Sequence, residues 1–248
     1  MKTRLIYAGV CGFLLSGFAA SAANAALVAT FTSGTQTVSL NGTLDATGQN
    51  YDINANQVSG VGNFLIFGFS ATANSPSAPA NGQVALEKAA TSFVVANAGS
   101  GFETMTINLA DNSFTPSASG SLESLTGAAS VTFFADGMSG GQTPDYFQYT
   151  SAADGATASS NNMAFNVGVL GPVGTVNTTV GPVDFTTTSP YTLSSTLTLG
   201  LNAGDSATLT FQTDPSPPAL PLPGASSLLA LGLVGLGALA VQRKKRFV

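Results

Sequence analysis

Residues 197–211 read LTLGLNAGDSATLTF, and this stretch decides the class of fold. Apolar side chains occupy every second position on both sides of a turn: Leu197, Leu199 and Leu201 before it, and Ala207, Leu209 and Phe211 after it. A period of two is typical of a strand that buries one face. The intervening Asn202–Asp205 contains the residue types that favour tight turns. The stretch therefore predicts a β-hairpin with one apolar face.

The same period recurs along the body of the chain. It places Met105, Ile107 and Leu109 on one face of a strand, and likewise Ala129, Val131 and Phe133. Further strands are predicted at 27–32, 36–40 and 145–150, and the apolar run FLIFGF at 64–69 predicts a strand buried on both faces or crossing the interior. Clusters of Gly, Asn, Ser and Pro at 74–82, 135–144 and 151–162 predict connections. We expect one all-β domain over residues 26–213, an antiparallel, jelly-roll-like β-sandwich, with a β-helix as the alternative.

Charge is distributed unevenly along the sequence. Six of the seven cations lie in the first four or the last six residues. The stretch between them contains all twelve acids and a single cation, Lys88. This body carries a net charge of −11, one cation against twelve acids. It cannot neutralise several phosphates, so nucleic acid is excluded as a partner.

Residues 1–25 have the three parts of a secretory signal peptide. Lys2 and Arg4 precede an apolar run, and the small residues Ala23 and Ala25 stand just before the expected cleavage, after which the mature chain begins at Ala26. An uncleaved membrane anchor is the alternative. The only cysteine, Cys11, lies inside this segment, so the body has no disulfide; a lipoprotein signal at Cys11 is a further alternative.

The C-terminal end predicts a membrane helix. Residues 214–223 hold five prolines and predict a stiff spacer, and 224–241 are eighteen uncharged residues. As a helix they span about 27 Å, close to the apolar thickness of a bilayer. The basic cluster Arg243, Lys244, Lys245 and Arg246, within the tail 242–248, predicts that this end stays in the cytoplasm and the body lies outside. A buried core helix is the alternative.

The order of proline motif, apolar helix and basic cluster resembles the PEP-CTERM family of bacterial sorting signals. The motif Leu220, Pro221, Leu222, Pro223 and Gly224 is most similar to its VPLPA variant. The resemblance covers the last 30 or so residues, and it implies an exosortase-type processing enzyme as a partner, with cleavage near this motif. It also implies a Gram-negative surface or matrix protein that is first held in the membrane and then released. The LPxTG sortase signal shares this order, but Pro223 stands where that enzyme needs Thr.

Few catalytic groups are present in the body. The chain has no histidine, and the expected mature chain has no cysteine and one lysine before its basic tail, which leaves carboxylate chemistry as the route to an enzyme. Two acids across a cleft could hydrolyse a glycosidic bond, with Glu87, Glu103 and Glu123 and nine Asp as candidates. We expect acids in turns and on solvated faces instead, and no enzyme activity and no cofactor.

A calcium site is the one metal hypothesis. Asp52, Asn54 and Asn56 place oxygen ligands at positions 1, 3 and 5 of an EF-hand-like loop, with Asp45 and Asn50 nearby. Gln57 and Asn63 then stand where that loop needs Gly and Glu. The stretch from Asp136 to Asp145 is a similar, weaker pattern, and ordinary turns are the alternative for both.

Aromatic residues near position 147 suggest a glycan-binding module. Sugar rings stack on Tyr and Trp, and since Trp is absent, Tyr146, Phe147 and Tyr149 are the candidates. Alternation predicts Phe147 and Tyr149 on one face and Tyr146 on the other, and core packing is the alternative role. We expect an exported structural or adhesive protein of the cell surface or extracellular matrix, with extracellular polysaccharide binding as the second hypothesis and a carboxylate glycan hydrolase as the third.

Overall fold

The computed structural model describes residues 27–75, 86–116, 120–135, 143–165, 173–188 and 190–216, with backbone only for 87–92. The expected signal peptide, the sorting motif, the apolar helix and the basic tail all lie outside these residues. Among the described residues, no helix is long and apolar enough to cross a membrane.

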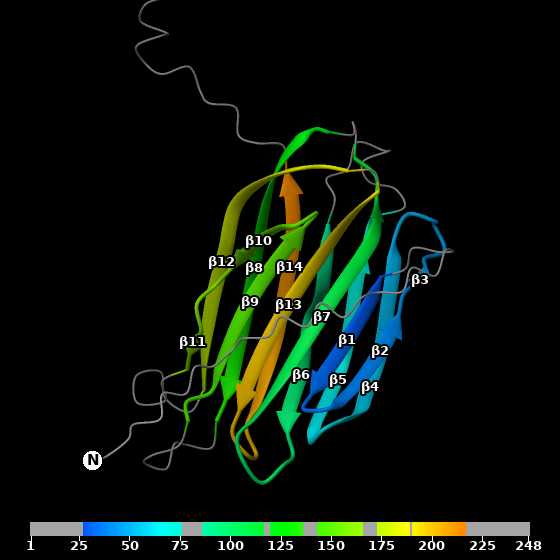
Figure 1. Cartoon of the computed structure of the whole chain (residues 1–248). Helices are drawn as coiled ribbons and strands as arrows, with labels where there is room; N and C mark the ends of the chain where they lie inside the picture. Colours follow the sequence, from blue (N-terminus) through cyan, green and yellow to red (C-terminus); the bar gives the residue numbers. More distant parts are fainter. Residues whose placement is uncertain are drawn as a thin grey trace, which may run out of the picture.

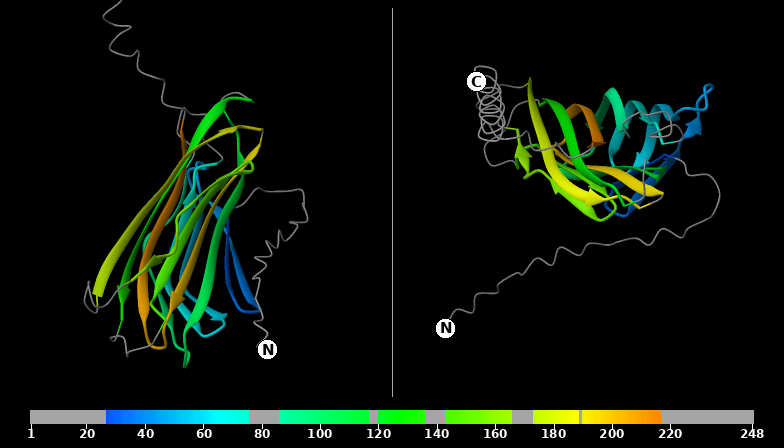
Figure 2. Two further views of the ribbon diagram at one scale, coloured as in Figure 1. Left: turned by 60° about the vertical axis from the view of Figure 1, so that its left-hand side comes forward. Right: turned by 90° about the horizontal axis from the view of Figure 1, so that it is seen from above.

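The described chain forms two antiparallel seven-stranded sheets that pack face to face (Figures 1 and 2). Sheet A has the order β10-β9-β13-β7-β1-β2, with β11 paired to β9, and sheet B has the order β12-β8-β14-β6-β5-β4-β3. Sheet A comprises β1 (Val28–Ser33), β2 (Gln36–Asn41), β7 (Glu103–Phe114), β9 (Tyr146–Ala153), β10 (Ala156–Ser159), β11 (Met163–Ala164) and β13 (Tyr191–Leu201). Sheet B comprises β3 (Thr43–Leu44), β4 (Tyr51–Val61), β5 (Phe64–Ala73), β6 (Glu87–Asn97), β8 (Leu122–Phe134), β12 (Val173–Thr186) and β14 (Ser206–Ser216). The predicted antiparallel β-sandwich is confirmed.

The core lies between the sheets, and alternation along each strand fills it. Met105, Ile107 and Leu109 of β7 are fully buried, as are Val131 and Phe133 of β8, which confirms their predicted orientation. Phe31, Phe69 and Phe93 contact one another edge to face with ring centroids 4.9 and 5.1 Å apart. These rings come from β1, β5 and β6, so the contacts join the two sheets.

The predicted hairpin at 197–211 is wrong in one respect. β13 pairs with β7 and β9 in sheet A, whereas β14 pairs with β6 and β8 in sheet B. The turn Asn202–Asp205 is therefore an arch from one sheet to the other, which Figure 1 shows where β13 passes into β14. Both strands point their apolar faces into the core, so the alternation is the same in an arch and in a hairpin.

Hydrogen bonds from two buried asparagines hold the arch. Asn97, at the end of β6, donates from Nδ2 to the carbonyl oxygens of Leu201 (2.9 Å) and Gly101 (2.8 Å). Its main-chain N–H donates to Asp205 O, and its own carbonyl accepts from Gly204 N–H. Asn202 donates from both its main-chain N–H and its Nδ2 to Asp145 Oδ1, at 2.9 and 2.8 Å. The arch is thus bonded to both sheets.

Two other strand assignments need correction. The run FLIFGF is neither buried on both faces nor a crossing segment, because Phe67 points outward from β5 with 40% of its surface exposed. Residues 151–162, predicted as a connection, include the end of β9 and all of β10. Asp154 and Gly155 between them have φ of 42° and 88°, the positive values that a two-residue hairpin turn requires.

The last strand extends into the predicted spacer. β14 continues through Pro215 to Ser216, where Pro215 lies opposite Leu125 of β8. On its other side β14 pairs with β6 only as far as Thr213. At Pro215, β14 has β8 as a neighbour but no longer pairs with β6. Proline is tolerated there because the N–H that it lacks is not needed for a ladder with β6.

We predict that Asn97→Ala lowers the free energy of unfolding by about 2 to 3 kcal/mol, because it removes the donor to two carbonyl oxygens at the arch. The matched control is Asn108→Ala, which removes an amide that donates to Thr196 on the outer face of sheet A and should cost about 0.5 kcal/mol. Urea denaturation measures both. Equal losses for the two variants would show that the arch does not depend on Asn97.

Candidate functional site

The outer face of sheet B carries an ordered array of neutral side chains over β12, β8 and β14. Because residues 129, 131 and 133 of β8 point into the core, residues 128, 130, 132 and 134 point outward. The strand register aligns each with one residue of β12 and one of β14. The four rows are Val173–Phe134–Ser206, Thr175–Thr132–Thr208, Asn177–Ser130–Thr210 and Thr179–Ala128–Gln212, and together we call them the β8 track.

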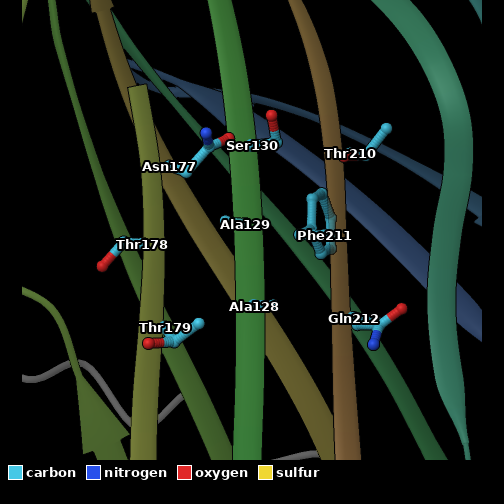
Figure 3. A pocket seen from close by; sticks show the side chains of 9 residues that line it. All are labelled: Ala128, Ala129, Ser130, Asn177, Thr178, Thr179, Thr210, Phe211 and Gln212. Atoms are coloured by element: carbon cyan, nitrogen blue, oxygen red, sulfur yellow. The ribbon is translucent and has the colours of Figure 1, made fainter. Parts of the chain in front are cut away.

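The β8 track contains a shallow hollow of about 300 Å³. It lies at Ala128, whose methyl group stands between the longer side chains of Thr179 and Gln212 (Figure 3). Asn177, Ser130 and Thr210 continue the lining in the next row, and the backbone of Ala129, Thr178 and Phe211 completes it. The hollow thus offers hydroxyl and amide groups around an apolar floor.

None of the four rows contains a charged residue. The nearest acid along β14 is Asp214, whose Oδ2 accepts a hydrogen bond from Gln212 Nε2 at 2.8 Å and so orients that amide. The hydroxyl groups of Thr132 and Thr175 are 2.7 Å apart. Neutral donors and acceptors of this kind suit a polyhydroxylated ligand and cannot hold an anion by ion pairing.

An exposed aromatic ring stands at one end of the β8 track. Phe134 is 43% exposed, and its neighbour Val173 is also exposed. Phe134 lies six positions after Ala128 along β8, which at a rise of about 3.3 Å per residue is about 20 Å. Sequence reasoning missed Phe134, although the signal was present: if Phe133 points inward, the next residue must point outward.

The aromatic residues predicted to bind glycan are placed elsewhere. Phe147 and Tyr149 share a face of β9, as alternation predicted, but both are fully buried in the core, so neither can lie against a sugar. Tyr146 is half-buried on the outer face of sheet A, where it stacks on Phe102 with ring centroids 6.1 Å apart. Gly200 leaves room for these rings, since a Cβ there would lie 2.5 Å from Tyr146.

Tyr149 instead belongs to a buried hydroxyl cluster between the sheets. Its OH lies 2.5 Å from Gln212 O and 3.0 Å from Thr213 Oγ1. Thr213 Oγ1 is also 2.5 Å from Ser151 Oγ and 2.7 Å from Ser195 Oγ. These contacts join β9 and β13 to β14, so Tyr149 has a structural role.

The predicted calcium loop is a strand. Asp52, Asn54 and Asn56 lie on β4 and extend over about 13 Å, so they cannot converge on one ion. Asp52 Oδ1 accepts from Thr72 Oγ1 across the sheet at 2.7 Å. Asp45 anchors the preceding turn: it accepts hydrogen bonds from the Asn50 side chain, Gln49 N–H and Thr47, and these bonds hold the pKa of its carboxyl well below its usual range.

The structure brings two other acids together. Asp145, just before β9, and Asp205, in the arch, are 2% and 6% exposed, and their carboxyl groups interact directly. Burial, together with the Asp205 carboxylate, raises the pKa of Asp145 to about 6. The hydrolase hypothesis needs two acids across an open cleft. These two are buried in contact, and no acid lines the hollow of the β8 track.

No protein-family model matches this chain, and no curated protein is significantly similar to it. One solved structure with some similarity is TmCBM61 in complex with β-1,4-galactotriose, at 8% identity over 75% of this chain and 86% of that chain, with a TM-score of 0.33. Another is the PA14 sugar-binding domain from an RTX adhesin, at 10% identity over 78% of this chain and 91% of that chain, with a TM-score of 0.29. Similarity at these TM-scores carries no argument about the function of this chain.

We predict that stability falls as the pH rises from about 4 to about 6.5 in buffer containing EDTA. The folded state binds the Asp145 proton more tightly than the unfolded chain, so this stabilisation is present at low pH and is lost as the pH passes the raised pKa. The decline should be about 1 to 2 kcal/mol after allowance for solvent screening.

In Asp145→Asn the part of this decline that comes from Asp145 should be lost, so the decline should be smaller by about 1 to 2 kcal/mol, while the exposed-site control Asp184→Asn keeps it in full. Burial also raises the pKa of Glu123, but that contribution is common to all three proteins and cancels in the comparison. Urea denaturation at several pH values measures the effect. A decline of the same size in Asp145→Asn would contradict the assignment.

Proposed function

We propose that this chain is an exported, non-catalytic structural or adhesive protein that binds a neutral polysaccharide along the β8 track. The observation that carries the proposal is the alignment of the exposed Phe134 ring with three uncharged rows that end in the hollow at Ala128. An aromatic face, neutral hydrogen-bonding groups and a shallow depression are the elements of a saccharide site.

The charge of the body supports a neutral ligand. With one lysine against twelve acids, the domain repels anionic polymers and offers no cationic cluster to hold them. The β8 track itself is uncharged, so hydroxyl groups of a neutral polysaccharide can exchange water for Thr, Ser, Asn and Gln side chains without an ion being desolvated.

The shape of the β8 track supports an extended ligand. It is open and about 20 Å long, and it runs along β8 between two flanking strands. A single aromatic ring on an open surface gives each protein copy a modest affinity for the polysaccharide, because most of the contacts with the ligand remain exposed to water. Many copies on one surface would bind a polymer much more strongly than a single copy.

We predict that affinity electrophoresis in gels containing galactan, dextran or hydroxyethylcellulose retards the wild-type protein in at least one of them, and that alginate does not. Phe134→Ala and Gln212→Ala should each raise the dissociation constant about 5- to 20-fold, because a stacked ring or an oriented amide is lost.

Phe67→Ala is the matched control, since Phe67 is a comparably exposed phenylalanine on the outer face of the same sheet, on β5. It should leave retardation unchanged. No retardation by any neutral polymer, or an equal loss in Phe67→Ala, would refute binding along the β8 track.

The delivery of the domain is a separate part of the proposal. We propose that residues 1–25 direct export with cleavage before Ala26, and that the C-terminal segment holds the protein in the membrane until an exosortase-type enzyme cleaves near Leu220–Gly224. The support is the resemblance of the proline motif, apolar segment and basic cluster to PEP-CTERM signals. Release would deliver the sandwich to the surface or the extracellular matrix.

Intact-mass measurement on protein from cells and culture fluid tests this delivery. The wild type should begin at Ala26 and end near Pro223, whereas Pro221→Ala/Pro223→Ala should keep its tail and stay in the membrane fraction. Retention of the full tail by both proteins would identify an ordinary membrane anchor and remove the processing enzyme from the proposal.

A further inference from the structure

β12 is an end strand of sheet B (Figure 1). From Val173 to Thr186 it pairs with β8, and no strand in the described part of the chain pairs with its other side. An end strand of this kind presents a row of main-chain N–H and C=O groups to any further strand. β12 therefore has one edge to which another strand can add.

The other ends of the two sheets are short or irregular. At the ends of sheet A, β10, β11 and β2 have four, two and six residues, and β3 at the other end of sheet B has two. β4, next to β3, has a bulge between Val58 and Val61. Short strands and bulges are common protections against pairing at an edge, whereas β12 has fourteen residues. Among the described strands, β12 thus has the longest regular edge.

The regular part of this edge has none of the residues that block pairing. Residues 173–181 read VGTVNTTVG, without charge or proline, and the Val and Thr among them are favoured in strands. Pro182 and a register shift between Val180 and Val183 end the regular part, and Asp184 lies beyond them. The protections typical of edge strands therefore begin only after Val180.

We propose that β12 pairs antiparallel with β12 of a second copy of this chain, with Asn177 of each copy opposite Asn177 of the other. Facing residues of an antiparallel pair lie on the same side of the sheet, so the two-fold axis must pass at a residue and not between two. An axis at Asn177 uses the whole regular run and places Thr175 opposite Thr179. It also places Val176 opposite Thr178, a side chain of nearly the same shape. The two halves of the run thus match each other.

The distribution of charge favours a second copy at this edge over other contacts between copies. The body has twelve acids and one lysine, so two copies repel each other over most of their surface. Residues 173–183 and the four rows of the β8 track are uncharged. The acid on β12, Asp184, lies seven positions from the axis, which separates it from its counterpart by about 46 Å. Pairing at β12 therefore brings two neutral surfaces together.

The second copy would extend the β8 track on its open side. Asn177 and Thr179 line the hollow and lie on the end strand. In the dimer, Thr175 of the second copy lies beside Thr179, and the two Asn177 side chains lie beside each other. The two β8 strands then run antiparallel about 14 Å apart, with both β12 strands between them. The pairing itself uses main-chain groups and does not depend on polysaccharide binding.

Disulfide cross-linking of the full chain tests the pairing and its register. Because Cys11 is the only cysteine, Cys11→Ala gives a background without thiols. In this background Asn177→Cys should form a disulfide-linked dimer in at least about half of the protein under mild oxidation, since facing Cα atoms lie about 4.5 to 5.5 Å apart. Non-reducing gel electrophoresis without added polysaccharide measures the yield.

Thr179→Cys is the matched control on the same face of the same strand. Its Cα would lie about 13 Å from its counterpart, too far for a disulfide, so it should give at least about 5-fold less dimer. An equal mixture of Thr175→Cys and Thr179→Cys should form the mixed dimer. Ser39→Cys, on the end strand β2, should give as little dimer as Thr179→Cys.

Thr175→Lys/Thr179→Lys adds a repulsive test of the same register. It places a lysine opposite a lysine on both sides of the axis, so it should lower the Asn177→Cys dimer yield at least about 5-fold. Unchanged circular dichroism would show that the variant folds. No dimer in Asn177→Cys, or equal yields in Asn177→Cys, Thr179→Cys and Ser39→Cys, would overturn the proposal. Since no polysaccharide is present, that result would leave the retardation by neutral polymers as a separate question.

Discussion

The sandwich depends on the hydrogen bonds that close its arch. β13 and β14 are consecutive in sequence but belong to different sheets, and each is an inner strand with neighbours on both sides. Four residues must therefore carry the chain across the thickness of the core, about 10 Å. Main-chain groups in so short a crossing cannot all reach a ladder partner, and Asn97, Asn202 and Asp145 supply the bonds that the ladders cannot. Without them, the carbonyl oxygen of Leu201 and the side chain of Asp145 would lose hydrogen bonds at the crossing.

Alternation in the sequence predicted strands and their inward faces, but it could not assign strands to sheets. Leu197, Leu199, Ala207 and Leu209 are all fully buried, as the pattern requires. The pattern does not distinguish two successive strands that pair in one sheet from two that lie in opposite sheets, because in both arrangements their apolar side chains point into the same core. That choice is made by Asn202 and Asp205, whose side chains turn inward. In the sequence they look like ordinary turn residues.

Residue type alone was a poor guide to the site. Tyr149 has the chemistry of a sugar platform, yet its position on β9 directs the ring into the core, where its hydroxyl meets Thr213. Asp52 and Asn54 have the chemistry of calcium ligands, yet an extended backbone spreads them along β4. Phe134 could have been selected from the sequence, because an aromatic residue at an outward position is informative. The Asp145–Asp205 contact could not, since sixty residues separate its members and only the arch brings them together.

The direction in which β14 leaves the sandwich has a mechanical consequence. β14 begins at the arch and ends at Ser216, and between these points it is held by β8 along its whole length and by β6 along most of it. A load applied to the C-terminal end of β14, and resisted by the rest of sheet B, acts parallel to the strand. All rungs of both ladders then resist together, whereas a perpendicular load would open them one at a time. β14 is thus placed to pass tension from its C-terminal end into sheet B without peeling away from its neighbours.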